Sequence, residues 1–198
     1  SSNPSDPAAY AWANFAADLG VVAETLLARS GGDSIHLAVG HSFGGTCTLG
    51  AAAVRPALFE RVLTLDPVLI RMPTQRNAPQ APSRSPGDRS KSRTAVFSSF
   101  EAALAGWQGK PLFQSWHPAV LRDYVYQGLV ERSDGQVELR CSPEIEVAVF
   151  AGARGYDLFP VAERITALTR ICWAERGDFS LDTYRALAGL IQHAQVGT

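Results

Sequence analysis

The sequence predicts an α/β fold in which helices cross over between parallel strands, with a helical insertion in the middle of the chain. Three short apolar runs with β-branched residues predict strands at 35–40, 62–65 and 168–174. Helical patterns precede, separate and follow these runs. Strands that alternate with helices are typical of crossover connections, so we expect a parallel sheet.

The first predicted helix covers residues 6–29. Asp6 is a candidate cap, and Pro7 stands at the first-turn position. Apolar residues then recur at helical spacing: Trp12, Phe15, Leu19, Val22 and Leu26. The helical composition of 44–54 and 180–194 predicts two further helices, and residues 194–198 resemble the opening of a final strand.

A long insertion separates the second and third strands. Its first part, 72–93, is rich in Pro, Ser and Arg and predicts a mobile loop. Its basic residues, from Arg76 to Arg93, fit a solvated loop, with an anionic-ligand role as the alternative. Residues 97–107, 117–130 and 143–153 have helical patterns and are interpreted as a cap. The expected organisation is therefore core at 1–70, cap at 71–160 and core at 161–198.

Composition excludes several classes of function. The 198 residues carry 18 basic and 19 acidic side chains, so no broad charged surface for nucleic acid is expected. Cys47, Cys141 and Cys172 are too scattered for a disulfide framework or a CxxC metal site. We expect no metal and no cofactor. No run approaches the roughly 20 apolar residues of a membrane span, and no signal peptide is readable. An intracellular location, cytoplasmic or peroxisomal, is expected, and the oligomeric state is left open.

The segment "GHSFGG", residues 40–45, matches the pattern G-x-S-x-G between a strand and a helix. In such a turn the serine is exposed in strained backbone, and glycines two residues before and after it give clearance. Gly40 and Gly44 take these positions around Ser42, and the Phe43 N–H would be an oxyanion donor. The alternative is a glycine-rich turn with a serine helix cap. A phosphate-binding loop is discarded because no Lys follows in a G-K-[ST] arrangement.

"GHSFGG" followed by "RPALFERVLTLDPVL" resembles the α/β-hydrolase superfamily over nearly the whole chain. The insertion, with "FSSFEAALAGWQGKPLFQSWHPAVLRDYVYQGL" and "DGQVELRCSPEIEVAVF", is similar to a narrower group that includes fungal toxin-biosynthesis hydrolases. The resemblance implies a serine nucleophile at Ser42, then an acid, then a histidine base in chain order. It places the acid at Asp178, after the third strand. A helix cap near Ser180 is the alternative role for Asp178, and Glu175, Asp182 and Asp66 are the alternative acids.

None of the four histidines fits the base. His36 is expected inside a strand, His41 is the variable residue of the motif, and His117 belongs to the cap. His193 precedes the final strand, whereas the catalytic histidine should follow it. We therefore expect this histidine beyond Thr198, and the second oxyanion donor before Ser1.

The leading hypothesis is a serine hydrolase that cleaves a carboxylic ester or thioester through an acyl-enzyme at Ser42. Aromatic side chains of the cap indicate a small-molecule substrate with an apolar acyl group, unless they only pack the cap: Phe97, Phe100, Trp107, Phe113, Trp116, Tyr124 and Tyr126. An acyltransferase of the same fold and a noncatalytic, truncated hydrolase are the alternatives.

Overall fold

The computed structural model describes residues 6–70 and 86–198, which form two compact units. One unit joins the N-terminal part of the chain, as far as residue 80, to residues 151–198. The other unit consists of residues 81–150. Over the described ranges, no helix combines the length and the apolar character that crossing a membrane requires. The role of the second unit as a cap, with boundaries at 71 and 160, stays a prediction.

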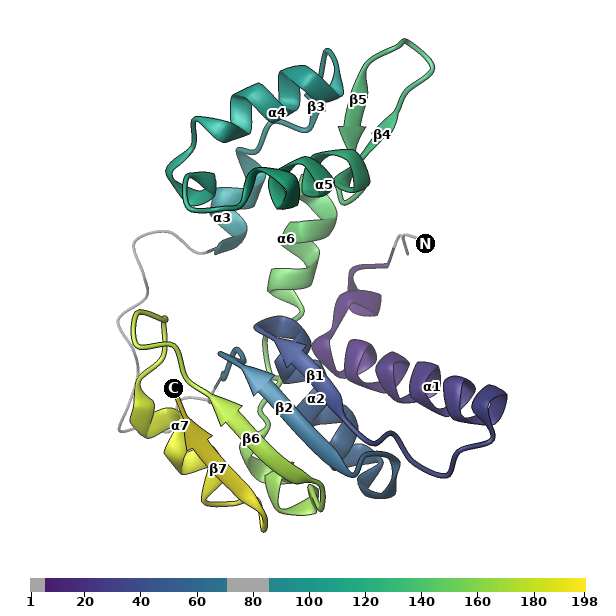
Figure 1. Cartoon of the computed structure of the whole chain (residues 1–198), viewed down its shortest axis with the longest axis vertical. Coiled ribbons are helices and arrows are strands. Elements are labelled where there is room, and N and C mark those ends of the chain that lie inside the picture. Colours follow the sequence, from purple (N-terminus) through teal and green to yellow (C-terminus); the bar gives the residue numbers. More distant parts are fainter. Residues whose placement is uncertain (1–5, 71–85) are drawn as a thin grey trace. The chain divides into compact units, whose positions relative to one another are not determined.

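The larger unit is built on a four-stranded sheet in the order β1-β2-β6-β7, with all neighbours parallel. Its strands are β1 (Ala38–His41), β2 (Arg61–Leu65), β6 (Leu168–Cys172) and β7 (Ala194–Gly197), labelled in Figure 1. The predicted α/β class with a parallel sheet is confirmed. Because the strands are parallel, the chain leaves each of them at the same edge of the sheet.

Helices join these strands. The elements are η1 (Pro7–Tyr10), α1 (Trp12–Ser30), α2 (Phe43–Val54), η2 (Pro56–Leu58), η4 (Phe159–Arg164) and α7 (Leu181–Ala188). Asp6 caps the first of them by accepting a hydrogen bond from the Ala8 N–H at 2.9 Å. The helix α1 ends at Gly31, which has a φ of 73° and closes the helix in the left-handed conformation that glycine favours.

The buried side of α1 differs from the expected apolar stripe. Its buried residues are Trp12, Ala16, Gly20 and Ala23, whereas Val22 and Leu26 are more than half exposed. The reason is the close approach of α1 to α2 and to the Arg55 side chain, which small residues permit. A Cβ on Gly20 would lie 2.5 Å from an Arg55 Nη atom.

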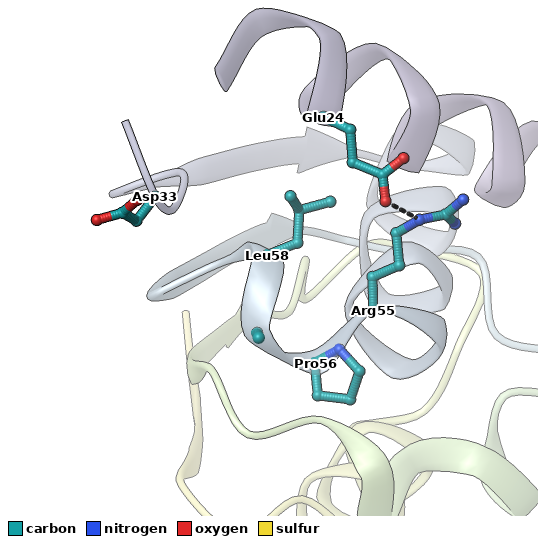
Figure 2. Close-up of a pocket in the computed structure, with 6 residues that line it drawn as sticks. Glu24, Asp33, Arg55, Pro56 and Leu58 are labelled. Carbon is teal, nitrogen blue, oxygen red and sulfur yellow. Dashed lines mark hydrogen bonds and ion pairs between the residues drawn. The ribbon is translucent and has the colours of Figure 1, made fainter. Parts of the chain in front are cut away.

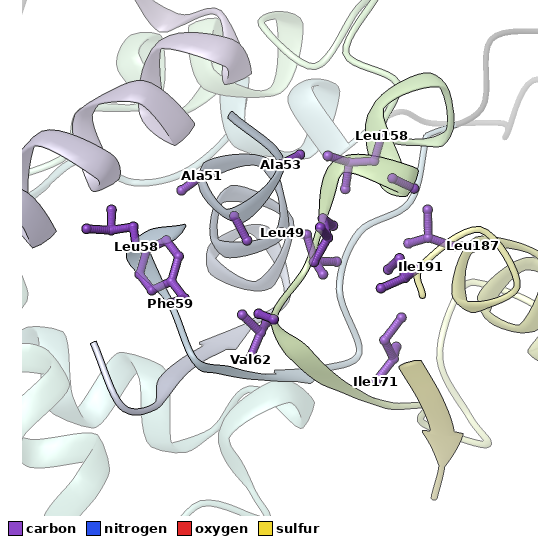
Figure 3. Close-up of a cluster of buried hydrophobic side chains, with 14 of the residues drawn as sticks. Leu49, Ala51, Ala53, Leu58, Phe59, Val62, Leu158, Ile171, Leu187 and Ile191 are labelled. Atoms are coloured by element: carbon purple, nitrogen blue, oxygen red, sulfur yellow. The ribbon is translucent and has the colours of Figure 1, made fainter. Parts of the chain in front are cut away.

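The core of the larger unit lies between one face of the sheet and the helices (Figure 3). The helix α2 is buried along almost its whole length, from Gly45 to Ala53. Val62 of β2 and Ile171 of β6 face it from the sheet, and Leu187 of α7 completes the packing. Burial of these side chains fixes α2, and therefore its N-terminus, against the sheet.

The second face of the sheet carries large exposed apolar side chains. Val39, Leu65 and Leu168 are 57%, 40% and 56% exposed. They alternate along the strands with the buried residues, as the two-residue period of a strand requires. Parallel sheets are usually covered on both faces, so this exposed face is unusual for a parallel sheet.

The smaller unit contains helices and a small antiparallel sheet. Its helices are α3 (Pro86–Lys91), α4 (Phe100–Gln108), η3 (Pro111–Phe113), α5 (Pro118–Gly128) and α6 (Pro143–Ala151). The strands β3 (Val96–Phe97), β4 (Leu129–Glu131) and β5 (Val137–Leu139) pair in the order β3-β5-β4. The helices α4, α5 and α6 correspond to the three predicted from the sequence. The sheet was not predicted, because its strands have only two or three residues.

Aromatic side chains form the core of the smaller unit. Trp107 and Phe113 are 4% and 8% exposed, and their ring centroids lie 5.8 Å apart. Phe97 and Tyr124 contact the Trp107 ring at 5.6 and 5.4 Å. Packing therefore accounts for much of the aromatic content that the sequence offered as a substrate surface.

The loop predicted at 72–93 lies largely outside the described residues. Within the part that is described, Pro86–Lys91 form the helix α3 where the sequence analysis expected a loop. At the end of the same segment, the Arg93 guanidinium binds both carboxylate oxygens of Glu146 at 3.1 and 2.9 Å. This basic residue is therefore paired within its own unit rather than solvated.

Candidate active site

Ser42 occupies a sharp turn between β1 and α2. Its backbone has φ 51° and ψ −123°, a conformation that is strained for a residue with a side chain. The Ser42 N–H donates to the Leu65 carbonyl at 2.9 Å, which extends the pairing of β1 with β2 by one residue. The Ser42 carbonyl then accepts the Thr46 N–H at 3.2 Å and opens the helix. Strand, turn and helix thus follow without a spacer, as the motif predicted.

Neighbouring atoms leave no room for a side chain at Gly40 and little at Gly45. A Cβ on Gly40 would lie 2.6 Å from the Gly44 carbonyl oxygen and 2.6 Å from Thr48 Oγ1. A Cβ on Gly45 would lie 3.1 Å from Pro67 Cβ. The predicted reason for Gly44 is wrong, since a Cβ there would meet no atom of the described residues within 4 Å. Gly44 contributes its backbone carbonyl to the crowding, and the second close approach belongs to Gly45.

Phe43 anchors the start of α2. Its ring packs on α1, with centroids 4.6 Å from Trp12 and 5.1 Å from Phe15. As the first residue of the helix, Phe43 has a backbone N–H that precedes the first intrahelical hydrogen bond. This N–H group is therefore available beside Ser42, at the positive end of the helix dipole.

A segment of three residues after β2 braces the turn. The Val68 N–H donates to the Ser42 carbonyl at 3.4 Å, and the Thr46 hydroxyl donates to the Val68 carbonyl at 2.7 Å. Pro67 lies against Gly45. The conformation of the Ser42 turn is consequently coupled to the chain that leaves β2.

Asp178 lies in the exposed loop between β6 and α7. The helix cap is Ser180, whose hydroxyl accepts the Thr183 N–H at 3.4 Å, so the capping role considered for Asp178 belongs to another residue. The Trp173 indole N–H closes the loop by donating to the Phe179 carbonyl at 3.0 Å. Asp178 thus follows the carboxyl end of a strand two positions from β1, at the same edge of the sheet as Ser42.

The alternative acids have different surroundings. Asp66, directly after β2, has a φ of 46°, and its Oδ1 accepts the Tyr184 hydroxyl at 2.8 Å and the Ala174 N–H at 3.3 Å. Glu175 is exposed in the turn after β6. Asp182 has a side chain that is 90% exposed and lies 3.7 Å from Arg185. Asp66 is therefore the carboxylate that the fold engages most.

Tyr184 is a site residue that the sequence analysis missed. Its side chain is fully buried, and its hydroxyl reaches both Asp66 Oδ1 and, at 3.2 Å, the Pro67 carbonyl. Burial raises the pKa of Tyr184 above its usual range, and the carboxylates of Asp66 and Asp178 raise that pKa further. The apolar position of Tyr184 in a helical pattern gave no signal for this contact.

Three of the four histidines, His36, His117 and His193, precede strands at the far edge of the sheet or cap a helix. His36 precedes β1 instead of lying inside a strand, and its Nδ1 pairs with Glu60 at 2.9 Å. His193 directly precedes β7, so the length of that strand, about 13 Å, separates it from the edge where Ser42 lies. His117 caps α5 through Nδ1. Of the hydrogen bonds found within 6–70 and 86–198, none joins Ser42 to His41 or to another histidine.

Solved structures share the fold of this chain. The peroxisomal α/β-hydrolase Lpx1 from Saccharomyces cerevisiae superimposes with a TM-score of 0.72 at 18% identity, over 93% of this chain and 52% of that one. The thioesterase domain from the curacin biosynthetic pathway gives 0.71 at 13% identity, over 99% and 69%. E-2-(acetamidomethylene)succinate hydrolase gives 0.70 at 21% identity, over 98% and 67%.

The chain has the α/β-hydrolase fold. This agrees with the resemblance found in the sequence. The chain spans about half to two thirds of the length of these solved structures. The sequence matches no model of a protein family, and no curated protein aligns with it significantly.

A surface hollow lies far from the turn. It has a volume of about 290 Å³ and is lined by Glu24, Asp33, Arg55, Pro56, Ala57 and Leu58 (Figure 2). The Arg55–Glu24 ion pair, 2.6 Å long, forms one side of it. This hollow follows the C-terminus of α2, whereas Ser42 precedes its N-terminus, about 18 Å away along the helix. Within the described ranges, no cluster of His, Cys, Asp and Glu has the make-up of a metal site.

Proposed function

We propose that this chain carries the nucleophile and the acid of a serine hydrolase that cleaves a carboxylic ester or thioester. The observation that carries the proposal is the backbone of Ser42. A positive φ at a non-glycine residue is costly, and it persists here because Gly40, Gly45 and the Val68 N–H hold the turn. Such a turn lifts the serine hydroxyl above the sheet and beside the Phe43 N–H.

In the proposed reaction, the Ser42 hydroxyl attacks the carbonyl carbon as a histidine removes its proton. The Phe43 N–H stabilises the negative oxygen of the tetrahedral intermediate. The alcohol or thiol then leaves with a proton from the histidine, and water releases the acyl group from Ser42 by the same steps. Asp178 orients the histidine and stabilises its charged form.

The base is proposed to come from outside residues 1–198. His36 and His193 lie at the opposite edge of the sheet, and His117 uses Nδ1 as a helix cap. A serine without a base keeps only a small part of the catalytic rate. We therefore expect residues 1–198 alone to hydrolyse esters little.

An apolar acyl group is proposed for the substrate. The smaller unit exposes large apolar side chains on η3, α5 and the turn between them, with Leu112, Trp116, Val120 and Tyr124 between 36% and 70% exposed. A cluster of large exposed apolar side chains is typical of a binding surface.

The test is hydrolysis of p-nitrophenyl esters and acyl thioesters of increasing chain length by the protein as its gene encodes it. We expect turnover that Ser42→Ala reduces at least a thousandfold. Ser30→Ala, which alters an exposed serine at the end of α1, should leave the rate within about twofold. Turnover that survives Ser42→Ala, or a chain that binds the esters without cleaving them, would contradict the proposal.

A further inference from the structure

Asp66 lies between the two parts of the candidate site, the Ser42 turn and the loop that carries Asp178. Its N–H donates to the Cys172 carbonyl at 2.7 Å, which continues the pairing of β2 with β6. At Asp66 the chain turns with a φ of 46° and enters Pro67 and Val68, the residues that brace the Ser42 turn. The carboxylate of Asp66 points the other way along the sheet edge, toward the loop after β6.

Among the described residues, the contacts of this carboxylate involve the loop that carries Asp178 and the helix that follows it. Oδ1 accepts the Ala174 N–H at 3.3 Å and the Tyr184 hydroxyl at 2.8 Å. A Cβ on Gly177 would lie 2.8 Å from Oδ2 and 3.0 Å from Oδ1, so the loop approaches the carboxylate as closely as a glycine permits. Asp178 is the next residue in the chain.

We propose that Asp66 is a positioning residue that holds the Asp178 loop at a fixed place relative to the Ser42 turn. The inference rests on the proposed function of Ser42 and Asp178. One short segment, Asp66–Val68, binds the nucleophile turn through Val68 and the acid loop through Asp66. Two reacting groups on different loops need such a fixed separation, because a displacement of about 1 Å can cost a hundredfold in rate.

This role differs from that of a catalytic acid. The acid of a serine hydrolase must present a free carboxylate oxygen to the histidine, whereas Oδ1 of Asp66 is occupied by two donors and Gly177 lies against both oxygens. Asp178 is exposed, and it is close enough to Tyr184 to raise the pKa of that phenol. The structure thus assigns different tasks to the two carboxylates.

The direct test is amide hydrogen exchange, which needs no substrate and no catalysis. In Asp66→Ala we expect the Ala174 amide to exchange at least about tenfold faster, since it loses a hydrogen bond to a charged acceptor. The backbone N–H of Trp173, which donates to the Gly197 carbonyl in the sheet, serves as the internal reference, and its exchange rate should be unchanged. Asp182→Ala, which removes an exposed carboxylate from α7, is the matched control. Unchanged exchange of Ala174 in Asp66→Ala would overturn the proposal.

Asp66→Asn separates positioning from acid catalysis and tests the proposal if Asp66→Ala does not fold. Asparagine keeps an oxygen acceptor and tolerates a positive φ. In Asp66→Asn we expect the Ala174 amide to exchange within about threefold of the wild-type rate. A fluorophosphonate should phosphonylate Ser42 of this variant within about tenfold of the wild-type rate, whereas Asp178→Asn should slow this reaction at least a hundredfold. A loss of phosphonylation in Asp66→Asn with Ala174 still protected would show that Asp66 is the acid and would overturn the proposal. If Ser42 does not react in wild type, the exchange result still stands, so the two failures are distinguishable.

Discussion

The Cα of Gly40 lies so close to the Gly44 carbonyl that an added Cβ would be 2.6 Å from its oxygen. Thr48 Oγ1 would be equally near, and it is itself held in place by donating to that carbonyl at 2.8 Å. No rotamer change relieves a contact with backbone. The strand that leads into Ser42 can therefore lie against α2 only with glycine at position 40.

Gly40→Ala should destabilise the protein, whereas Gly44→Ala should not. The first substitution forces atoms into the Gly44 backbone, and we expect the free energy of unfolding to fall by about 2–3 kcal/mol or more. The second places a Cβ in open space near the start of a helix, where alanine is favoured over glycine by up to about 1 kcal/mol. Urea unfolding followed by circular dichroism measures both. Equal losses in the two variants would contradict this account of the turn.

Thr64→Val should stabilise the protein. The Thr64 side chain is fully buried in β2, and its Oγ1 has no hydrogen-bond partner among the described residues. Valine has the same shape without the unpaired hydroxyl, so we expect a gain of about 1–2 kcal/mol. Thr169→Val is the matched control in β6: there the hydroxyl donates to the Ala167 carbonyl at 2.9 Å, and its loss should destabilise. A destabilising Thr64→Val would show that the hydroxyl is bonded.

Stability should fall above pH 9 because of Cys47. Burial raises the pKa of the Cys47 thiol from about 9 to about 11, and burial, together with the Cys47 thiolate, raises the pKa of Tyr156 to about 12. A raised folded-state pKa means that the unfolded chain releases the proton first. The protonated Cys47 thiol therefore makes its full contribution to the free energy of unfolding below pH 9. This contribution is lost as pH rises toward 11, and its limit is about 2–3 kcal/mol.

The measurement is the free energy of unfolding from pH 7 to 11 for wild type and Cys47→Ala. The variant should show a shallower decline above pH 9, and Cys47→Ala combined with Tyr156→Phe should be shallower still. Parallel curves for wild type and both variants over this range would contradict the assignment. A constant offset between the curves reports only the packing cost of the substitutions.

The local pattern around Ser42 could be predicted because it depends on neighbours in sequence. The strand before it, the helix after it and the crowding at Gly40 follow from a five-residue motif in its context. The clearance predicted for Gly44 belongs instead to Gly45, where a Cβ would lie 3.1 Å from both the Gly40 carbonyl oxygen and Pro67 Cβ, and Pro67 is more than twenty residues away in the sequence. The contact of Tyr184 with Asp66 spans a still greater distance in sequence, and nothing local marks it.

The buried face of α1 shows the same limit. A hydrophobic pattern selects the largest apolar residues, and it therefore favours Val22 and Leu26. The fold instead buries Ala16, Gly20 and Ala23, because the distance to α2 and the Arg55 side chain determines which sizes fit. The short strands β3, β4 and β5 were missed because two or three residues show no readable alternation.

Covalent labelling by a fluorophosphonate tests the central claim most directly. Incubation of the protein as its gene encodes it, followed by peptide mass spectrometry, should place a single phosphonyl group on Ser42. Ser42→Ala should abolish the label, and residues 1–198 expressed alone should react at least a hundredfold more slowly, since none of the four histidines is hydrogen-bonded to the Ser42 hydroxyl. A phosphonyl group on another residue, or labelling that persists in Ser42→Ala, would contradict the assignment of Ser42 as the nucleophile.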